Sequence, residues 1–366
     1  MTKILEDLAK AAVEGNAEKM KEEMNSHDRV MAAFELKEPD RVPVLPFVRE
    51  WCFRQVGIPF SEGMTNVEKY VYSQLYSIKK FGYDVVQGIS AIHAESEAMG
   101  SVLGIPFDGP PYVKVPAVQD YSTDLPKLKI PRPHKDGRLP LILEGNRRIK
   151  KAVEKEIAVM GYAQGCWRHT CMLRGTNNAF LDTKKKPAEL KKLLDIATES
   201  LIVCGEAVAE SGVDIILISD PTSSGDMISR KTFEEFSFPY LKTEIKAFKM
   251  MGLKVCLHIC GDTNDRLDLM AEAGPDAISI EEKVDLAQAK KLVGNKVCIV
   301  GNISTVNVLF LGTPDQVIAE SKIAIEKAAK GGGYILASGC GVPADTPSEN
   351  IAAMVYASKT FGKYRG

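Results

Sequence analysis

The chain has 366 residues, 45% of them hydrophobic, so it can bury a full core as one large domain. Its 47 basic and 48 acidic residues nearly cancel, which disfavours a nucleic-acid-binding protein, because such proteins usually carry a basic surplus. No apolar run approaches the roughly 20 residues that span a bilayer, and the first residues, MTKILEDLAKAAVEG, lack the apolar centre of a secretion signal. We therefore expect a cytoplasmic protein without a membrane partner.

The first predicted element is a helical extension over residues 1–38. It contains few helix breakers, and residues such as Ile4, Leu5 and Leu8 follow a helical spacing. Pro39 and Pro43 then mark the change from helix to strand.

Eight short, almost continuously apolar runs follow, and amphipathic segments separate many of them. Parallel strands that are buried on both faces have this composition. Eight strand–helix units predict an α/β fold, a single (β/α)8 TIM barrel spanning residues 1–366. A doubly wound open sheet is the alternative. The runs cover residues 42–47, 83–89, 157–165, 213–220, 254–261, 276–281, 296–302 and 333–341.

One long segment interrupts this alternation. Residues 100–140 are rich in proline and glycine, as in GIPFDGPPYVKVPAV and IPRPHKDGRLP. We expect an irregular insertion, which on a barrel often covers the mouth of the active site.

Catalytic residues of a barrel lie at the carboxyl ends of its strands. Here those ends carry more polar and thiol groups than packing requires, namely Asp220, His258, Cys260, Glu281, Glu282, Asn302 and Cys340.

The stretch LKVCLHICGDTND places His258 and Cys260 on the same face of a strand, about 6–7 Å apart. Cys340 ends the last strand in SGCG and could complete a His–Cys–Cys set, because a catalytic zinc site needs three protein ligands. On spacing alone, buried thiols are an equal alternative. We assign Cys256 to the core. Cys204 and Cys298 are also assigned to packing, while Cys52, Cys166 and Cys171 remain unassigned.

The segments LHICG, SIEEKVDLAQAKKLVGNKVCIVGNIS and GYILASGCGVPADTPSEN resemble the uroporphyrinogen decarboxylase superfamily, most closely its corrinoid-dependent methyltransferase branch. The resemblance is strong over residues 210–360 and weaker before them. Decarboxylases of this fold carry Gly-His-Gly where this chain has Gly339-Cys340-Gly341, and the zinc methyltransferases carry cysteine there. The resemblance therefore implies a TIM barrel with His258, Cys260 and Cys340 as zinc ligands.

The activity that the resemblance implies is zinc-dependent methyl transfer. The methyl group would pass between the cobalt of cobalamin, supplied by a partner corrinoid protein, and a small substrate. That substrate would be a thiol such as coenzyme M or a methoxy compound, as in O-demethylation. Two alternatives stay open: a tetrapyrrole decarboxylase without metal, and a non-catalytic relative that binds a corrinoid protein.

Five further residues are candidates for the site. We predict Asp220 and Glu282 as catalytic residues that orient a ligand or handle a proton. We predict Trp167, Arg168 and Asn302 as substrate-binding residues. For each of the five, a structural hydrogen bond, salt bridge or packing role is an equal alternative.

Overall fold

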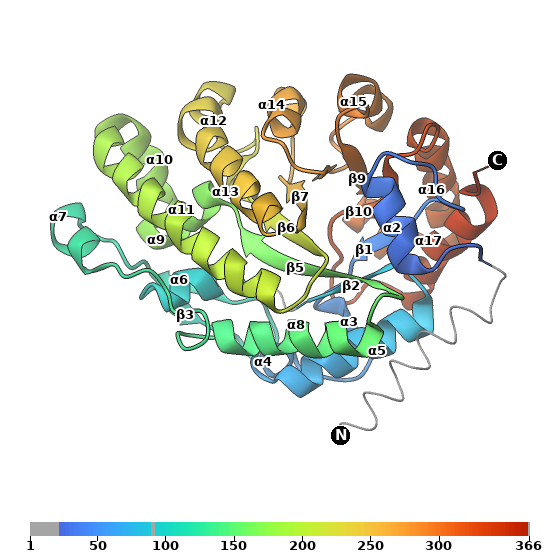
Figure 1. The fold of residues 1–366 in the computed structure, drawn as a ribbon, viewed down its shortest axis with the longest axis horizontal. Helices are drawn as coiled ribbons and strands as arrows, with labels where there is room; N and C mark the ends of the chain where they lie inside the picture. Colours follow the sequence, from blue (N-terminus) through green and yellow to red (C-terminus); the bar gives the residue numbers. More distant parts are fainter. Residues whose placement is uncertain (1–21, 89–91, 365–366) are drawn as a thin grey trace.

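The computed structural model describes residues 22–88 and 92–364, and in them the eight predicted strands form one parallel sheet that is curved into a nearly closed barrel (Figure 1). The TIM-barrel-like prediction is thus confirmed. The open-sheet alternative is not what the chain adopts. The barrel strands are β1 (Val44–Phe47), β2 (Val85–Gln87), β5 (Ala158–Gln164), β6 (Ile215–Ser219), β7 (Lys254–His258), β8 (Ala277–Ser279), β9 (Cys298–Ile303) and β10 (Tyr334–Gly341).

The barrel closes between its two edge strands. The sheet order runs β1-β10-β9-β8-β7-β6-β5-β2, so β1 and β2 lie at its ends. The backbone N–H of Asp84 donates to the Val44 carbonyl (2.9 Å), and the Asp84 carboxylate accepts from the Val44 N–H (2.8 Å). A buried side chain at the start of β2 thus joins the two edges.

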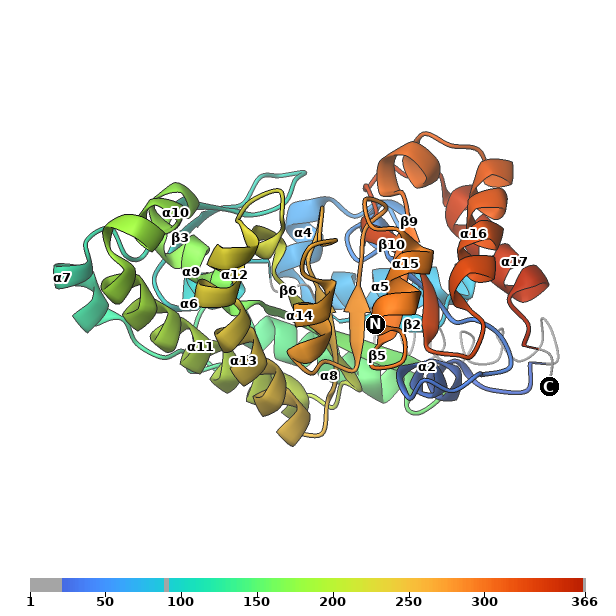
Figure 2. The same ribbon diagram turned by 90° about the horizontal axis from the view of Figure 1, so that it is seen from above.

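Helices surround the strands and bury the outward-facing apolar residues (Figures 1 and 2). None of the helices in residues 22–88 and 92–364 is long and apolar enough to cross a membrane. The helices are α2 (Ser26–Phe34), α3 (Trp51–Arg54), α4 (Phe60–Thr65), α5 (Val67–Phe81), α6 (Ala94–Ala98), α7 (Tyr121–Asp124), α8 (Leu139–Val153), α9 (Cys166–Arg174), α10 (Thr176–Lys185), α11 (Pro187–Glu210), α12 (Arg230–Phe236), α13 (Phe238–Met250), α14 (Leu267–Glu272), α15 (Leu286–Val293), α16 (Pro314–Ala328) and α17 (Ser348–Phe361), with short turns η1 (Leu125–Lys127), η2 (Pro221–Ser223) and η3 (Thr305–Phe310).

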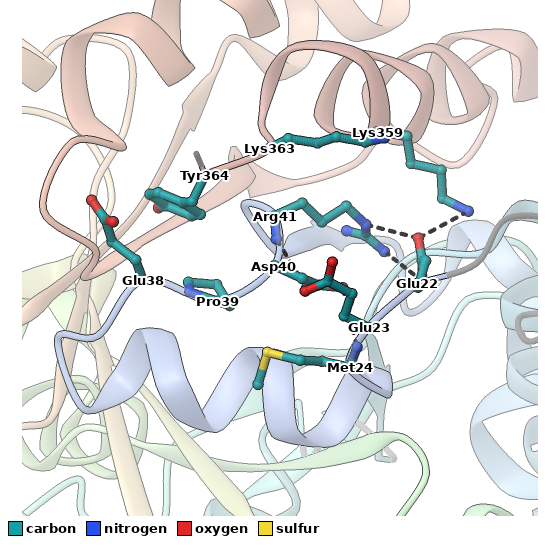
Figure 3. Close-up of a pocket in the computed structure, with 10 residues that line it drawn as sticks. All are labelled: Glu22, Glu23, Met24, Glu38, Pro39, Asp40, Arg41, Lys359, Lys363 and Tyr364. Carbon is teal, nitrogen blue, oxygen red and sulfur yellow. Dashed lines mark hydrogen bonds and ion pairs between the residues drawn. The ribbon is translucent and has the colours of Figure 1, made fainter. Parts of the chain in front are cut away.

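The predicted N-terminal extension is helical over α2, and residues 1–21 lie outside the described residues. This helix contacts β2, β5 and β10, and the N–H of His27 donates to the carbonyl of Glu156, just before β5. It therefore covers the amino ends of the strands. A cavity of about 410 Å³ beside it is lined mostly by charged side chains, including Glu22, Arg41 and Lys359 (Figure 3).

The insertion at residues 100–140 is less irregular than predicted. It contains an antiparallel pair, β3 (Val102–Gly104) and β4 (Tyr112–Val115), and then α7. The loop between these strands reaches the segment that follows β1: the Ser61 N–H donates to the Phe107 carbonyl (3.0 Å), and Arg54 pairs with Asp108 (2.8 Å). The β3–β4 hairpin therefore lies at the rim where the barrel strands end.

Candidate metal centre

The structure brings together the three residues that the sequence analysis predicted as metal ligands, although they come from two strands far apart in the sequence. His258 ends β7, Cys260 follows two residues later, and Cys340 lies near the end of β10. One donor atom from each lies within 4.8 Å of the other two. His258 Nε2 is 2.9 Å from Cys260 Sγ and 3.8 Å from Cys340 Sγ, and the two sulfur atoms are 3.4 Å apart. Donors around a tetrahedral zinc ion lie roughly 3.5–3.8 Å apart, so this set fits such an ion.

Local backbone and side-chain contacts orient the three donors. His258 is 6% exposed, and its Nδ1 lies 2.9 Å from Ser279 Oγ on the neighbouring strand β8. This contact leaves Nε2 free to face the two thiols. Gly261 follows Cys260 with φ +72°, and a Cβ there would lie 2.3 Å from an oxygen of Asp226. Only glycine allows the chain to turn here and leave Cys260 beside His258.

The two thiols share one proton unequally. Hydrogen bonds donated by the Cys260 thiol and His258 lower the pKa of Cys340, with the Cys260 bond as the larger cause. The same bond raises the pKa of Cys260, which acts as its donor. The contacts therefore favour ionisation of Cys340, and the thiolate is the form of cysteine that binds a metal ion.

Glu281, which the sequence analysis places at a strand end without predicting it as catalytic, lies beside this group. Burial and the charge of Cys340 raise the pKa of Glu281, while the N–H of Gly261 donates to its carboxylate. Glu282, which we predicted as catalytic, is exposed and accepts from Ser304 Oγ (3.0 Å). Alternation of side chains explains why the two glutamates differ. Glu281 lies two residues after Ser279, so its side chain points into the barrel as that of Ser279 does.

Asp220 directly follows β6 and is not one of the donors, although its backbone N–H donates to the His258 carbonyl (2.9 Å). It is fully buried, and its Oδ1 accepts from the backbone N–H of Arg168 (3.0 Å) and from Thr222 Oγ1 (3.1 Å). Its Oδ2 has no partner among the residues that the structure describes. Burial raises the pKa of Asp220 to about 6. The carboxylate thus stabilises the first turn of α9, which carries Arg168.

The neighbouring residues Trp167 and Arg168 point in different directions. Trp167 is fully buried, stacks on Phe180 at a 6.0 Å centroid distance, and donates from Nε1 to the Thr222 carbonyl. This position matches the packing alternative. Arg168 is half-buried and donates to Tyr162 Oη and to Ser219 Oγ, both on inward positions of the barrel strands.

Asn302 contacts the same turn as Glu281. Its Nδ2 donates to the carbonyls of Glu281 (3.1 Å) and Val284 (2.8 Å), which ties the segment after β8 to β9. The contacts go to backbone carbonyls, and Asn302 also lines a groove with Glu320 and Ile323 of α16, so it supports the turn that carries Glu281.

The remaining thiols are buried. Those assigned to packing are Cys204, Cys256 and Cys298, and the three unassigned ones are buried as well: Cys52, Cys166 and Cys171.

Comparisons with known proteins find relatives over almost the whole chain. The uroporphyrinogen decarboxylase family model matches residues 25–361. A methylcobamide:CoM methyltransferase, MtaA of Methanosarcina barkeri, is 32% identical over 337 residues, covering 90% of this chain and 96% of that protein. A uroporphyrinogen decarboxylase of Anaeromyxobacter dehalogenans is 28% identical, covering 91% and 99%. A solved structure of a methyltransferase from Methanosarcina mazei superposes with TM-score 0.85 at 30% identity, covering 93% and 99%.

Proposed function

Because this chain belongs to the uroporphyrinogen decarboxylase family and resembles methylcobamide:CoM methyltransferases within it, we propose that it is a zinc-dependent corrinoid methyltransferase. It would move a methyl group between the cobalt of a protein-bound cobalamin and a thiol such as coenzyme M or a methoxy compound. The observation that carries this proposal is the convergence of His258, Cys260 and Cys340 at the carboxyl ends of β7 and β10.

The residues present suit zinc better than other metal ions. Two thiolates and one imidazole are the ligands that zinc prefers, and three protein ligands leave a position for a substrate. When bound, zinc lowers the pKa of a coordinated thiol and polarises a coordinated oxygen. The two cysteinates would balance the charge of the ion. Ser279 would hold the His258 ring in the orientation that directs Nε2 at it.

A proton acceptor is needed when a thiol substrate binds as a thiolate. Glu281 is half-buried beside Cys340, and its raised pKa favours proton uptake. We assign that role to Glu281. The role we predict for Asp220 is indirect, since it positions α9 and so the guanidinium of Arg168.

The cobalamin would come from a separate corrinoid protein. The eight strands of the described residues are consumed by one barrel, and the β3–β4 hairpin at its rim exposes apolar side chains. They include Val102, Ile105, Phe107, Tyr112 and Val115. We propose that this rim contacts the corrinoid protein.

The decarboxylase alternative is supported by sequence similarity, since uroporphyrinogen decarboxylases are among the relatives of this chain. It gives no reason for two cysteines and a histidine to converge. The non-catalytic alternative predicts partner binding without turnover.

The test is methyl transfer from methylcobalamin to 2-mercaptoethanesulfonate, or from methoxybenzoate to cob(I)alamin, followed by cobalamin absorbance. We expect turnover with one of these pairs, and Cys340→Ala should reduce it by roughly a hundredfold or more because the metal is lost. Cys298→Ala, which removes a buried thiol elsewhere in the barrel, is the matched control. Porphyrinogen decarboxylation without cobalamin turnover would reject the proposal.

A further inference from the structure

The two cysteines of the donor group are the most accessible thiols of the chain. Cys260 and Cys340 are half-buried at the carboxyl ends of the strands, whereas the other six cysteines are at most 5% exposed. Burial also raises the pKa of thiols in this second set, to about 12 for both Cys52 and Cys298. A water-soluble oxidant reacts fastest with thiols that are accessible and can ionise. Oxidation of this protein is therefore directed to Cys260 and Cys340.

These two accessible thiols also lie next to each other. Their sulfur atoms are 3.4 Å apart, and a disulfide requires them to approach to about 2.0 Å. Rotation of a cysteine side chain between staggered positions moves its sulfur atom farther than this. Cys260 follows the end of β7, and Cys340 lies one residue before the end of β10. The bond can therefore form at the rim of the barrel without a rearrangement of the sheet.

A disulfide and a metal ion would compete for these two sulfur atoms. Cysteine binds a metal ion as the thiolate, and the sulfur atoms of a disulfide carry no such charge. Of the three donors, oxidation would leave His258 alone, although a zinc site of this kind needs three protein ligands. Formation of the disulfide would therefore empty the site.

We propose that Cys260 and Cys340 form a reversible disulfide when a peroxide is present, and that this bond switches the site off by preventing metal binding. The loss of metal rests on the proposed function, whereas the disulfide itself does not. One thiolate attacks an oxygen of hydrogen peroxide and becomes a sulfenic acid as hydroxide leaves. The second thiolate attacks the sulfenic sulfur and expels another hydroxide. The sulfur pair thus loses two electrons to the peroxide, and two protons from solvent convert both hydroxides to water. A dithiol reverses the step by thiol–disulfide exchange.

The test follows the thiols of the purified full-length protein, both as isolated and after treatment with a chelator. Hydrogen peroxide is added, the remaining thiols are alkylated under denaturing conditions, and the peptides are identified by mass spectrometry. We expect the number of free thiols to fall from eight to six, with one cross-linked peptide pair that contains Cys260 and Cys340. Zinc-loaded protein should release one zinc ion per disulfide formed, measured with a chromogenic chelator. Dithiothreitol should restore all eight thiols and the uptake of zinc.

Two variants and three outcomes make the result decisive. Cys340→Ser should abolish the cross-link, and Cys298→Ser, which removes a buried thiol, should still form it; thermal unfolding checks that both variants fold. Eight unchanged thiols, a cross-link to a buried cysteine, or sulfinic acid in place of the disulfide would each overturn the inference. A disulfide between Cys260 and Cys340 in protein that binds no metal and transfers no methyl group would support the inference and reject the proposed function.

Discussion

The donor group depends on a residue that would not itself contact the metal. Ser279 Oγ lies 2.9 Å from His258 Nδ1 and fixes which ring nitrogen faces the cysteines. Such supporting contacts typically change metal affinity by about 10–100-fold. We therefore expect Ser279→Ala to weaken metal binding by that factor, measured by competition with a chelator. Ser321→Ala is the control, because Ser321 is also buried but its hydroxyl has no partner among the described residues. Equal metal affinity in the two variants would contradict the role of Ser279.

Asp220 makes the stability of the protein depend on pH. Burial raises the pKa of Asp220 from 3.8 to about 6, so the folded protein binds this proton more tightly than the unfolded chain does. The resulting stabilisation is complete below the ordinary value and is lost as the pH rises through about 6. Between about pH 4 and pH 7, the free energy of unfolding of the wild type should fall by roughly 2–3 kcal/mol relative to Asp220→Asn. Urea unfolding at several pH values checks this, and parallel curves for the two proteins would contradict it.

At the scale of elements, the strands were predictable and the hairpin was not. Buried parallel strands are continuous apolar runs, and all eight appear in the sequence. The strands β3 and β4 have only three and four residues between prolines and glycines, too few to show a period.

The side chains near the site were harder to predict than the strands. Alternation of side chains along β8 would have favoured Glu281 over Glu282, but it can be applied only when the end of the strand is known. Trp167 is buried because of the way α9 packs against its neighbours, and no local sequence pattern predicts that packing.

The β3–β4 hairpin should matter for the protein partner and not for the barrel. Phe107 is 71% exposed at the rim, whereas Met250 is 79% exposed at the end of α13, beside the amino ends of the strands. Phe107→Ser should lower kcat/KM for methyl transfer with the corrinoid protein by roughly fivefold or more, since exposed aromatic residues often dominate interface energies. Transfer with free cobalamin should not change. Met250→Ser should alter neither rate, and an equal effect of both variants would contradict a docking role for the hairpin.

At the scale of the whole molecule, a buried cluster of ion pairs links the residues that precede β1 to the junction where β1 meets β2. Asp84 is fully buried and accepts from Arg29 (2.8 Å) and Arg41 (2.8 Å), and these arginines lower its pKa. Glu22, which also pairs with Arg41, is drawn beside it in Figure 3. No local pattern in the sequence matches Asp84 with Arg29 or Arg41, which lie 55 and 43 residues away, so the closure of the barrel had to come from the structure.

Breaking this cluster should destabilise the fold strongly. Asp84→Asn leaves two buried guanidinium groups without their shared carboxylate, and removing one partner of a buried ion pair costs about 3–5 kcal/mol. Asp268→Asn removes an exposed carboxylate that pairs with Arg230 and should cost about 1 kcal/mol or less. Urea unfolding measures both values. Similar losses in the free energy of unfolding for the two variants would show that the junction between β1 and β2 does not depend on Asp84.

The central claim is that His258, Cys260 and Cys340 hold a zinc ion that the chemistry requires. The most direct measurement is metal analysis with zinc X-ray absorption on protein purified without chelators. We predict about one zinc per chain, with two sulfur ligands near 2.3 Å and one nitrogen near 2.0–2.1 Å, and loss of that zinc in Cys340→Ala without unfolding. Folded wild-type protein that contains no metal and takes up no zinc when it is supplied would contradict the account.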